Sequence, residues 1–251
     1  MKKLANKVAV VTGASKGIGA AIARRLSAEG ARAVVNYATD REGADRVVRE
    51  ITEAGGEALA LRANVSSEAD IQALFEEVRG RYGRIDILVN NAGVYAFLAL
   101  EQVTADEYRR QFDTNVLGLL LATRTALPLF PAEGGSIINI SSNASTLAPR
   151  TGSVYAATKA AVDTITRSLA KELANRRIRV NAVNPGLVLT EGTRSAGMVG
   201  SEFEKAVLRG TPLGRVGRPE DIAPLVAFLA SDDDAGWITG ETILVSGGAG
   251  L

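Results

Sequence analysis

Thr12-Gly13-Ala14-Ser15-Lys16-Gly17-Ile18-Gly19 follows the apolar run Val8–Val11 directly and opens a helical pattern over residues 17–29. Glycine permits positive φ angles and lets a ligand approach the backbone closely. The free amide groups and the dipole at a helix start favour an anion such as a pyrophosphate. The stretch therefore predicts a strand, a phosphate-binding turn and a helix, although its glycine spacing alone also fits a turn without a ligand.

Six further apolar runs, rich in Val and Ile, alternate with longer amphipathic stretches. Most lack polar alternation, as buried parallel strands do. We expect strands at Val8–Val11, Ala33–Asn36, Ala58–Leu61, Ile85–Val89, Ser136–Ile140, Ile178–Val183 and Thr242–Val245, and helices over 17–29, 40–54, 67–82, 105–127, 153–174 and 219–230. This order predicts a single α/β domain over residues 1–251, a Rossmann-type doubly wound parallel sheet of seven strands with helices on both faces.

Local signals mark where several helices begin and end. Capping-box patterns stand at Thr39–Glu42, Thr104–Glu107 and Ser201–Glu204, Pro219 suits a first helical position, and Gly30 and Gly55 suit helix ends. Residues 185–200 have weak periodicity, with four Gly and two Thr. We expect residues 185–210 to form a mobile flap over the substrate.

The composition excludes several kinds of chemistry. The 251 residues contain neither Cys nor His, so disulfides, zinc sites of the usual ligands and triads that need imidazole are excluded, and we expect no metal site. The 29 Lys and Arg against 28 Asp and Glu leave a net charge of +1, which argues against nucleic-acid or membrane partners. No apolar run is long enough to cross a bilayer. We expect a soluble, cytoplasmic protein.

Tyr155 and Lys159 lie four residues apart in Ser-Val-Tyr-Ala-Ala-Thr-Lys, thirteen residues after Ser142. Positions i and i+4 share one face of a helix, so the ammonium group is expected beside the phenol. A nearby cation lowers the pKa of a phenol, which makes tyrosine a usable acid or base. Each residue alone also fits an ordinary role, as a packing tyrosine, a surface lysine or a strand-end serine. Ser141 is chemically equivalent to Ser142, and the spacing to Tyr155 selects Ser142.

A set of motifs in this chain resembles those of the short-chain dehydrogenase/reductase family. The set consists of the turn spacing Thr-Gly-x-x-x-Gly-x-Gly, Asn90-Asn91-Ala92-Gly93, Asn115, Ser142, Tyr-x-x-x-Lys, and Asn184-Pro185-Gly186 followed by Thr190. The likeness spans nearly the whole chain and is greatest to 3-oxoacyl-(acyl-carrier-protein) reductase-like and glucose 1-dehydrogenase-like members. It implies that Tyr155 is the general acid or base, Lys159 binds the nicotinamide ribose, and Ser142 binds the carbonyl oxygen. It also implies that Asn115 holds a water that links Lys159 to solvent.

The resemblance implies a dinucleotide site. Its expected residues are Gly13, Ser15, Lys16, Gly17, Ile18, Gly19, Asn36, Tyr37, Ala38, Asn64, Val65, Asn91, Ala92, Gly93, Tyr155, Lys159, Pro185, Gly186, Val188 and Thr190. The second strand ends without a carboxylate to repel a 2′-phosphate. Lys16 pairs naturally with a phosphate and Arg41 is a possible helper, so we expect NADP(H) to be favoured over NAD(H). Asp40 fits a helix-start charge, and Asn64 stands where the family usually has Asp.

We expect a largely apolar substrate pocket, lined by Tyr95, Phe97, Ser142, Ala144, Leu147, Tyr155, Gly186 and Met198. The leading hypothesis is an NADPH-dependent carbonyl reductase acting on a ketone or β-keto acyl compound. The alternatives are an NAD(P)-dependent dehydrogenase of a sugar or other secondary alcohol, and a non-catalytic dinucleotide sensor. An enoyl reductase is disfavoured, because that branch of the family separates Tyr and Lys more widely.

The expected partners are a small carbonyl compound and further copies of the chain. Residues 130–135 contain no basic side chain for an acidic carrier protein, so docking of an acyl carrier protein stays open. The family pairs subunits through the helices near 105–127 and 153–174. Phe112, Val116, Leu119 and Leu120 give the first of these an apolar surface, which also fits intramolecular core. We expect a homotetramer.

Overall fold

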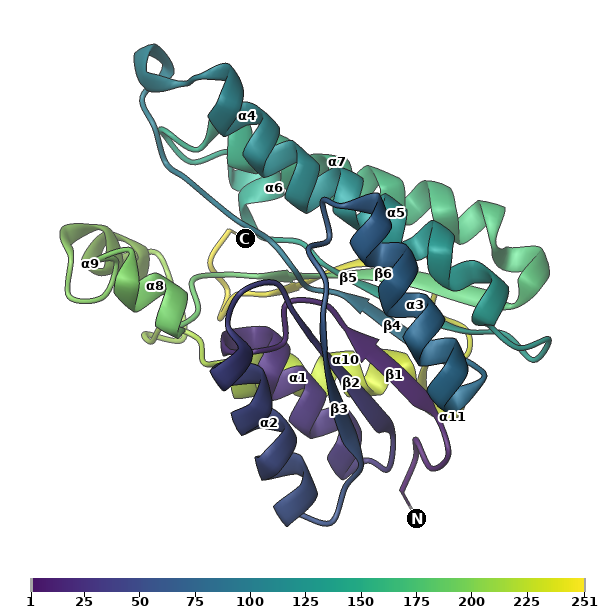
Figure 1. The fold of residues 1–251 in the computed structure, drawn as a ribbon. Helices are drawn as coiled ribbons and strands as arrows, with labels where there is room; N and C mark the ends of the chain where they lie inside the picture. Colours follow the sequence, from purple (N-terminus) through teal and green to yellow (C-terminus); the bar gives the residue numbers. More distant parts are fainter. Residues whose placement is uncertain (1, 251) are drawn as a thin grey trace.

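A computed structural model describes residues 2–250 and contains one parallel sheet of seven strands in the order β3-β2-β1-β4-β5-β6-β7 (Figure 1). The strands are β1 (Val8–Val11), β2 (Arg32–Tyr37), β3 (Ala58–Arg62), β4 (Ile87–Asn90), β5 (Gly135–Ile140), β6 (Ile178–Pro185) and β7 (Thr242–Val245). The predicted fold class and all seven strands are confirmed. The main differences are that β4 begins two residues later than expected and β6 extends to Pro185.

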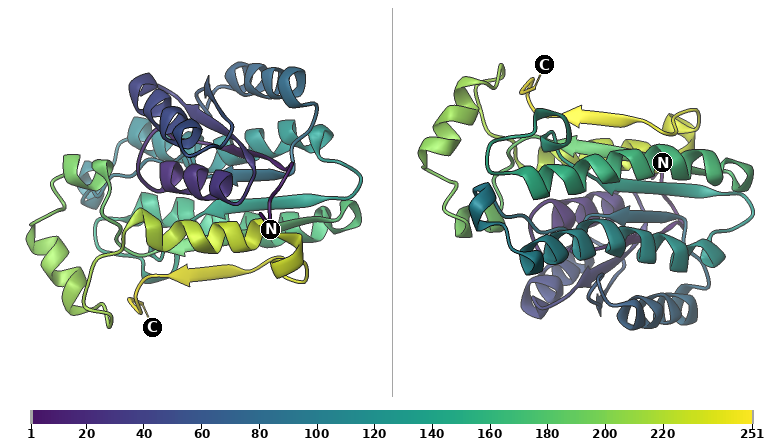
Figure 2. Two further views of the ribbon diagram at one scale, coloured as in Figure 1. Left: turned by 90° about the horizontal axis from the view of Figure 1, so that it is seen from below. Right: turned by 90° about the horizontal axis from the view of Figure 1, so that it is seen from above.

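Helices cover both faces of the sheet, as Figure 2 shows from its two sides. One face carries α1 (Gly17–Ala28), α2 (Arg41–Glu53), α10 (Pro219–Ala230) and the short α11 (Asp232–Ala235), and the other carries α3 (Glu68–Tyr82), α5 (Gly118–Ala126) and α7 (Ser153–Glu172). Alternate residues of β1 enter the two cores, with Ala9 and Val11 on the first face and Val8 and Val10 on the second. This double burial explains the unbroken apolar run in the sequence.

The predicted helix 105–127 is interrupted. It consists of α4 (Ala105–Phe112), a π-helical turn (Asp113–Leu117) and α5, followed by a short 3-10 turn at Leu127–Leu129. A side chain at Gly118 would lie 2.8 Å from Val65 Cγ2, so α5 approaches the segment after β3 more closely than any larger residue allows. Single π turns inside helices often occur at functional sites. This one carries Asn115.

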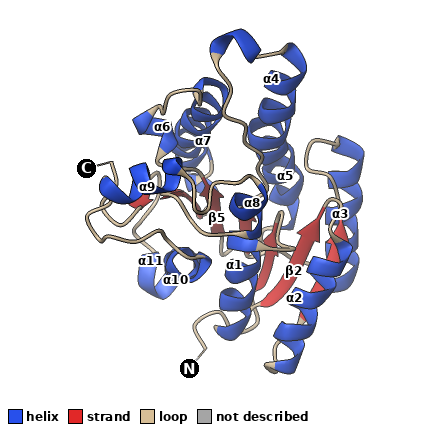
Figure 3. Ribbon diagram, turned by 90° about the vertical axis from the view of Figure 1, so that its left-hand side faces the viewer, coloured by secondary structure: helices blue, strands red, loops and turns tan. Residues whose placement is uncertain are grey.

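Three short helices were not expected: α6 (Ala144–Leu147), α8 (Glu191–Ser195) and α11. A fourth, α9 (Glu202–Arg209), follows the predicted Ser201 cap, although its range was not predicted. Thr104 and Ser201 accept the predicted bonds from the amides of Glu107 and Glu204. The cap of α2 was misplaced by one residue, because Asp40 rather than Thr39 accepts the amide of Gly43. Figure 1 shows α8 and α9 beyond the strands at its left-hand side, and in Figure 3 this side faces the viewer. Within residues 2–250, no helix has the length and apolar character needed to cross a membrane.

Candidate active site

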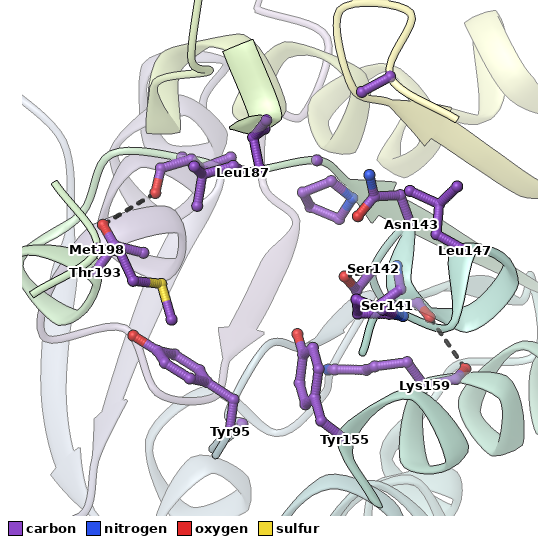
Figure 4. Close-up of a pocket in the computed structure, with 18 of the residues that line it drawn as sticks. Tyr95, Ser141, Ser142, Asn143, Leu147, Tyr155, Lys159, Leu187, Thr193 and Met198 are labelled. Carbon is purple, nitrogen blue, oxygen red and sulfur yellow. Dashed lines mark hydrogen bonds between the residues drawn. The ribbon is translucent and has the colours of Figure 1, made fainter. Parts of the chain in front are cut away.

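The site lies where the strand order reverses. β1 neighbours both β2 and β4, so the connections after β1 and β4 run to opposite sides and leave a crevice beyond their carboxyl ends. A cavity of about 490 Å³ opens there. Segments that follow β1, β4, β5 and β6 line it, together with α7, α9 and the C-terminal residues Ala249 and Gly250 (Figure 4).

The glycine turn is held against the loop after β4. Gly13 and Gly17 have φ angles of +61° and +57°, which glycine adopts without strain. A side chain at Gly13 would lie 2.8 Å from the Cα atom of Ala92, so no other residue fits there. The hydroxyl of Thr12 accepts the amides of Asn91 and Ala92 at 2.9 and 3.0 Å. The turn is thus a rigid backbone cradle at the start of α1.

Asn36 supports this cradle from inside the fold. Its side chain is buried, its Oδ1 accepts the amide of Gly13 at 3.2 Å, and its Nδ2 donates to the carbonyls of Leu61 and Ala63. We had expected Asn36 to contact the dinucleotide. The hydrogen bonds of this side chain go to the backbone of the glycine turn, of β3 and of the residue after β3, so its contact with a dinucleotide stays a prediction. Tyr37 is also buried, whereas Ala38 is exposed.

Lys16 stands at the outer edge of the cradle with its side chain half exposed. Its Nζ lies 3.5 Å from Asp40 Oδ2, which makes a loose ion pair, and Asp40 also caps α2 through the amide of Gly43. Asp40 therefore has the helix-start role that its position in the sequence indicated. The pair leaves a cation beside the turn, partly neutralised by one carboxylate.

Tyr155 and Lys159 meet on one face of α7, as their spacing predicted. The ammonium nitrogen of Lys159 lies 5.8 Å from the centre of the Tyr155 ring and donates to the carbonyl of Ile140 at 2.9 Å. Burial lowers the pKa of Lys159 to about 8, and the carboxylate of Asp163 partly opposes that shift. Figure 4 shows the amine beside the ring and the phenol pointing into the cavity.

The pKa of the Tyr155 phenol is raised, mainly by burial. The hydrogen bond with Ser142 lowers it and Tyr95 raises it further. The sequence had predicted a lowered pKa from the ammonium group. That expectation is wrong for this structure, because the loss of hydration dominates and the amine lies beside the ring, bonded to Ile140. The phenol is therefore protonated at neutral pH.

The two neighbouring serines have different partners. Ser141 Oγ donates to the backbone carbonyl of Lys159 at 3.1 Å, so it ties the end of β5 to α7. Ser142 Oγ accepts the amide of Ala144 at 3.1 Å, and the Ser142 hydroxyl lowers the pKa of the Tyr155 phenol. The hydroxyl that faces the phenol is that of Ser142, in agreement with the choice made from spacing.

Asn115 is buried in the π turn. Its Oδ1 accepts the amide of Val94 and its Nδ2 donates to the carbonyl of Val94, both at 2.8 Å, and the same amide donates to Thr158 Oγ1 at 3.0 Å. Asn115 and Lys159 also border a second cavity of about 10 Å³, with Asn90 on its wall. This volume is about that of one water molecule.

Aromatic rings form one wall of the main cavity. The ring of Phe97 lies 5.8 Å from that of Tyr155 and 6.1 Å from that of Phe203, and Tyr95 lies 6.1 Å from Tyr155. All eight residues expected in the substrate pocket line the cavity. Leu187, Thr193, Phe203, Ala206 and Val207 line the cavity from the expected flap, whereas Ala249 and Gly250 were missed by sequence reasoning. The apolar spacing of Phe203, Ala206 and Val207 behind the Ser201 cap was an available signal for α9.

The residues expected at the dinucleotide divide into groups. Ile18, Asn91, Gly93, Tyr155, Lys159, Pro185, Gly186, Val188 and Thr190 line the main cavity. Gly13, Ser15, Lys16, Gly17, Gly19 and Ala92 belong to the adjoining turn and loop. Asn64 is exposed on the segment after β3, and Val65 borders the small cavity rather than the large one. Ile18 at the start of α1 therefore lines the same cavity as Ser142, Tyr155 and Lys159.

Known proteins resemble this chain over its full length. A family model described as Enoyl-(Acyl carrier protein) reductase matches residues 13–250. An uncharacterized oxidoreductase of Methylorubrum extorquens is 57% identical and covers 99% of both chains. A 3-oxoacyl-[acyl-carrier-protein] reductase of Synechocystis is 40% identical, covering 99% of this chain and 98% of its own. A 3beta-hydroxysteroid dehydrogenase 1 of Eggerthella lenta is 42% identical, covering 99% and 95%.

A solved structure, that of a double mutant of a Serratia marcescens short-chain dehydrogenase/reductase, superposes with a TM-score of 0.93 at 37% identity. It covers 99% of this chain and 100% of its own. The Serratia marcescens structure shares the fold found here, and the relatives named above are called oxidoreductase, reductase and dehydrogenase. The chain belongs to the short-chain dehydrogenase/reductase family and is an NAD(P)-dependent oxidoreductase acting on CH–OH or C=O groups.

Proposed function

We propose that this enzyme is an NADPH-dependent carbonyl reductase for uncharged, apolar ketones or β-keto acyl compounds, with Tyr155 as the general acid. The observation that carries the proposal is the state of Tyr155. Its side chain is half-buried, loss of hydration raises the pKa of its phenol, and the phenol points into an apolar cavity beside Ser142. A protonated phenol is the form that reduction needs, because the product alkoxide must receive a proton.

When bound, a nicotinamide dinucleotide supplies the hydride to the carbonyl carbon. The Tyr155 hydroxyl donates its proton to the carbonyl oxygen, and the Ser142 hydroxyl donates a hydrogen bond to the same oxygen. Lys159, with a pKa of about 8, is mostly a cation at neutral pH and stabilises the phenolate that remains. The small cavity between Asn115 and Lys159 is suited to a water that returns a proton toward Tyr155.

The glycine turn fits the phosphates of such a cofactor. Side chains at Gly13 and Gly17 would fill the space between the turn and its neighbours Ala92 and Thr190. Two features support a preference for NADPH: Lys16 offers a cation at the edge of the turn, and β2 ends in a buried amide, Asn36, rather than a carboxylate. The opposing feature is Asp40, which already pairs with Lys16.

The cavity favours an uncharged substrate. Its walls hold the apolar and aromatic side chains of Tyr95, Phe97, Leu147, Met198 and Phe203, and Lys159 is the single charged residue among those that line it in residues 2–250. A substrate carboxylate near the reacting carbon would therefore find Lys159 as its only cationic partner. Lys159 is already needed to stabilise the phenolate of Tyr155. A long acyl chain or a ring system would instead bury apolar surface against these walls.

The reverse reaction, oxidation of a secondary alcohol, uses the same residues, and a relative named as a hydroxysteroid dehydrogenase favours it as second candidate. Oxidation needs the phenolate of Tyr155, whose formation burial opposes. We therefore expect reduction to predominate at neutral pH and oxidation to need a higher pH.

We also propose that the enzyme is a homotetramer. Leu120 and Leu117 are partly exposed on the surface of α5 and the π turn, and Tyr108 lies half exposed on α4. Leu119, which we had placed on that surface, is buried in the subunit instead. Light scattering at micromolar concentration is expected to give about four times the chain mass, and a monomer would contradict the proposal.

The decisive test is a substrate panel with both dinucleotides. Ketones, β-keto thioesters, sugars and secondary alcohols would be assayed at the nicotinamide absorbance band, in both directions. We expect the highest kcat/KM for an apolar ketone or β-keto thioester with NADPH. Activity confined to polar sugars, or to the reduction of C=C bonds, would overturn the proposed substrate class.

A further inference from the structure

The carboxylate of Glu191 lies at the start of α1, inside the proposed phosphate cradle. Glu191 Oε2 accepts the amide of Gly17 at 3.1 Å, although the two residues are 174 positions apart. Glu191 is the first residue of α8, in the flap, and Thr190 before it packs against Gly17. One anionic oxygen thus occupies a backbone donor that the proposed function assigns to the cofactor's pyrophosphate.

The start of α1 has no other cap nearby. Its N-cap residue, Lys16, makes no side-chain capping bond, and no acidic residue stands in the first turn of the helix. Free amides at a helix start favour an anion because of the helix dipole. Glu191 of the flap, which is remote in sequence, therefore supplies the capping anion that most helices take from residues at their own start.

The contact is well defined on the flap side. Thr190 and Thr193 form a reciprocal capping box, and Thr193 Oγ1 also donates to the carbonyl of Val188 at 3.1 Å. These bonds fix the first turn of α8 and hence the direction from which Glu191 reaches α1. Thr190 and Val188 both line the main cavity, so a displacement of this turn also changes the wall of the site.

We propose that Glu191 is a placeholder for the cofactor's pyrophosphate, and that it caps α1 in the free enzyme and is displaced when a dinucleotide binds. The inference rests on the proposed dinucleotide site. A single amide cannot be shared fully between two anions, and their like charges repel. Binding must therefore break the contact between Glu191 and Gly17, which weakens affinity and links the flap to occupancy of the cradle.

The test compares Glu191→Gln with the wild-type enzyme by direct binding. The amide keeps the shape and a weak acceptor but removes the charge. We expect the Kd values of NADPH and NADH to fall about five- to tenfold each, since the competing charge is lost for both. The Kd of adenosine, which lacks the pyrophosphate, should stay unchanged.

The control is Glu202→Gln, which removes an exposed carboxylate of the same flap, paired with Lys205 at 2.7 Å. It should leave all three Kd values unchanged. Equal dinucleotide Kd values in Glu191→Gln and wild type, or an equal gain for adenosine, would overturn the placeholder role alone. Failure of the wild-type enzyme to bind either dinucleotide would overturn the proposed site together with this inference.

Discussion

Buried charged side chains have several polar partners at the amino end of the sheet and few at its carboxyl end. At the amino end, Asp86 accepts the amide of Val8 at 2.9 Å and is paired with Arg84 and Lys7. Buried Arg179 donates to the carbonyl of Leu229 and to Asp232. At the carboxyl end, Lys159 is equally buried, but within residues 2–250 its ammonium group has the carbonyl of Ile140 as its only hydrogen-bond partner.

This difference separates charges that hold the fold from charges that perform chemistry. Removing one member of a buried, paired set of charges leaves its partners unpaired, which destabilises the fold. A buried charge with few partners has a shifted pKa, and such groups cluster at active sites. Lys159 and Tyr155 both show such shifts, while the amino end shows the paired arrangement.

The largest expected effect is that of Tyr155→Phe at the carboxyl end. The ring and its contacts with Phe97 and Tyr95 are kept, while the proton donor is lost. We expect kcat for ketone reduction to fall about 10²- to 10⁴-fold, with the Kd of NADPH nearly unchanged. Steady-state kinetics and fluorescence titration measure the two quantities.

The matched control is Tyr95→Phe, which removes another hydroxyl from the wall of the same cavity. It should change kcat by less than about fivefold, because Tyr95 has no assigned proton transfer. A Tyr155→Phe enzyme with near wild-type turnover would contradict the role of the phenol. A loss of equal size in both variants would point to a general change in the cavity.

The second effect belongs to the amino end. Asp86→Ala removes the acceptor of the Val8 amide and the partner of Arg84, so a buried donor is left unsatisfied. We expect the free energy of unfolding to fall by about 2–3 kcal/mol, measured by urea denaturation, while kcat of the folded enzyme stays unchanged. The exposed pair of Asp106 and Arg109 offers the control, and Asp106→Ala should have no measurable effect.

The sequence predicted those parts of the molecule that depend on local pattern. Apolar runs located the seven strands, and the spacing of Tyr155, Lys159 and Ser142 brought those residues together. Prediction from the sequence failed for features that depend on contacts between residues far apart in the chain. Nothing local shows that Asn36 bonds the glycine turn, that burial outweighs the ammonium group at Tyr155, or that Glu191 reaches Gly17. For α9 the sequence analysis recognised the Ser201 cap but not the range, because the helix has only eight residues and follows the weakly periodic stretch 185–200.

The third effect concerns the pH dependence of stability. Lys159 has a folded pKa of about 8, below its ordinary value of 10.5, so between these values the unfolded chain binds more protons than the folded one. Stability due to this group therefore rises with pH across that window and is lowest below pH 8. Lys159→Met should be more stable than wild type at pH 7, and the difference should shrink by about 2 kcal/mol between pH 8 and 9.5. A difference independent of pH would show that Lys159 has an ordinary pKa in the folded protein.

The smallest expected effect tests the charge at the edge of the cradle, where Lys16 is half exposed and lies 3.5 Å from Asp40. Lys16→Ala should raise the Kd of NADPH about tenfold and that of NADH less than about twofold, since only the former carries a 2′-phosphate. Asp40→Asn keeps a capping side chain for α2 but removes the carboxylate 3.5 Å from Lys16. It should therefore tighten NADPH binding about two- to threefold, and only while Lys16 is present. Titrations with both dinucleotides at one ionic strength measure these Kd values. An equal rise in the Kd of NADPH and of NADH in Lys16→Ala would refute the pairing of Lys16 with the 2′-phosphate.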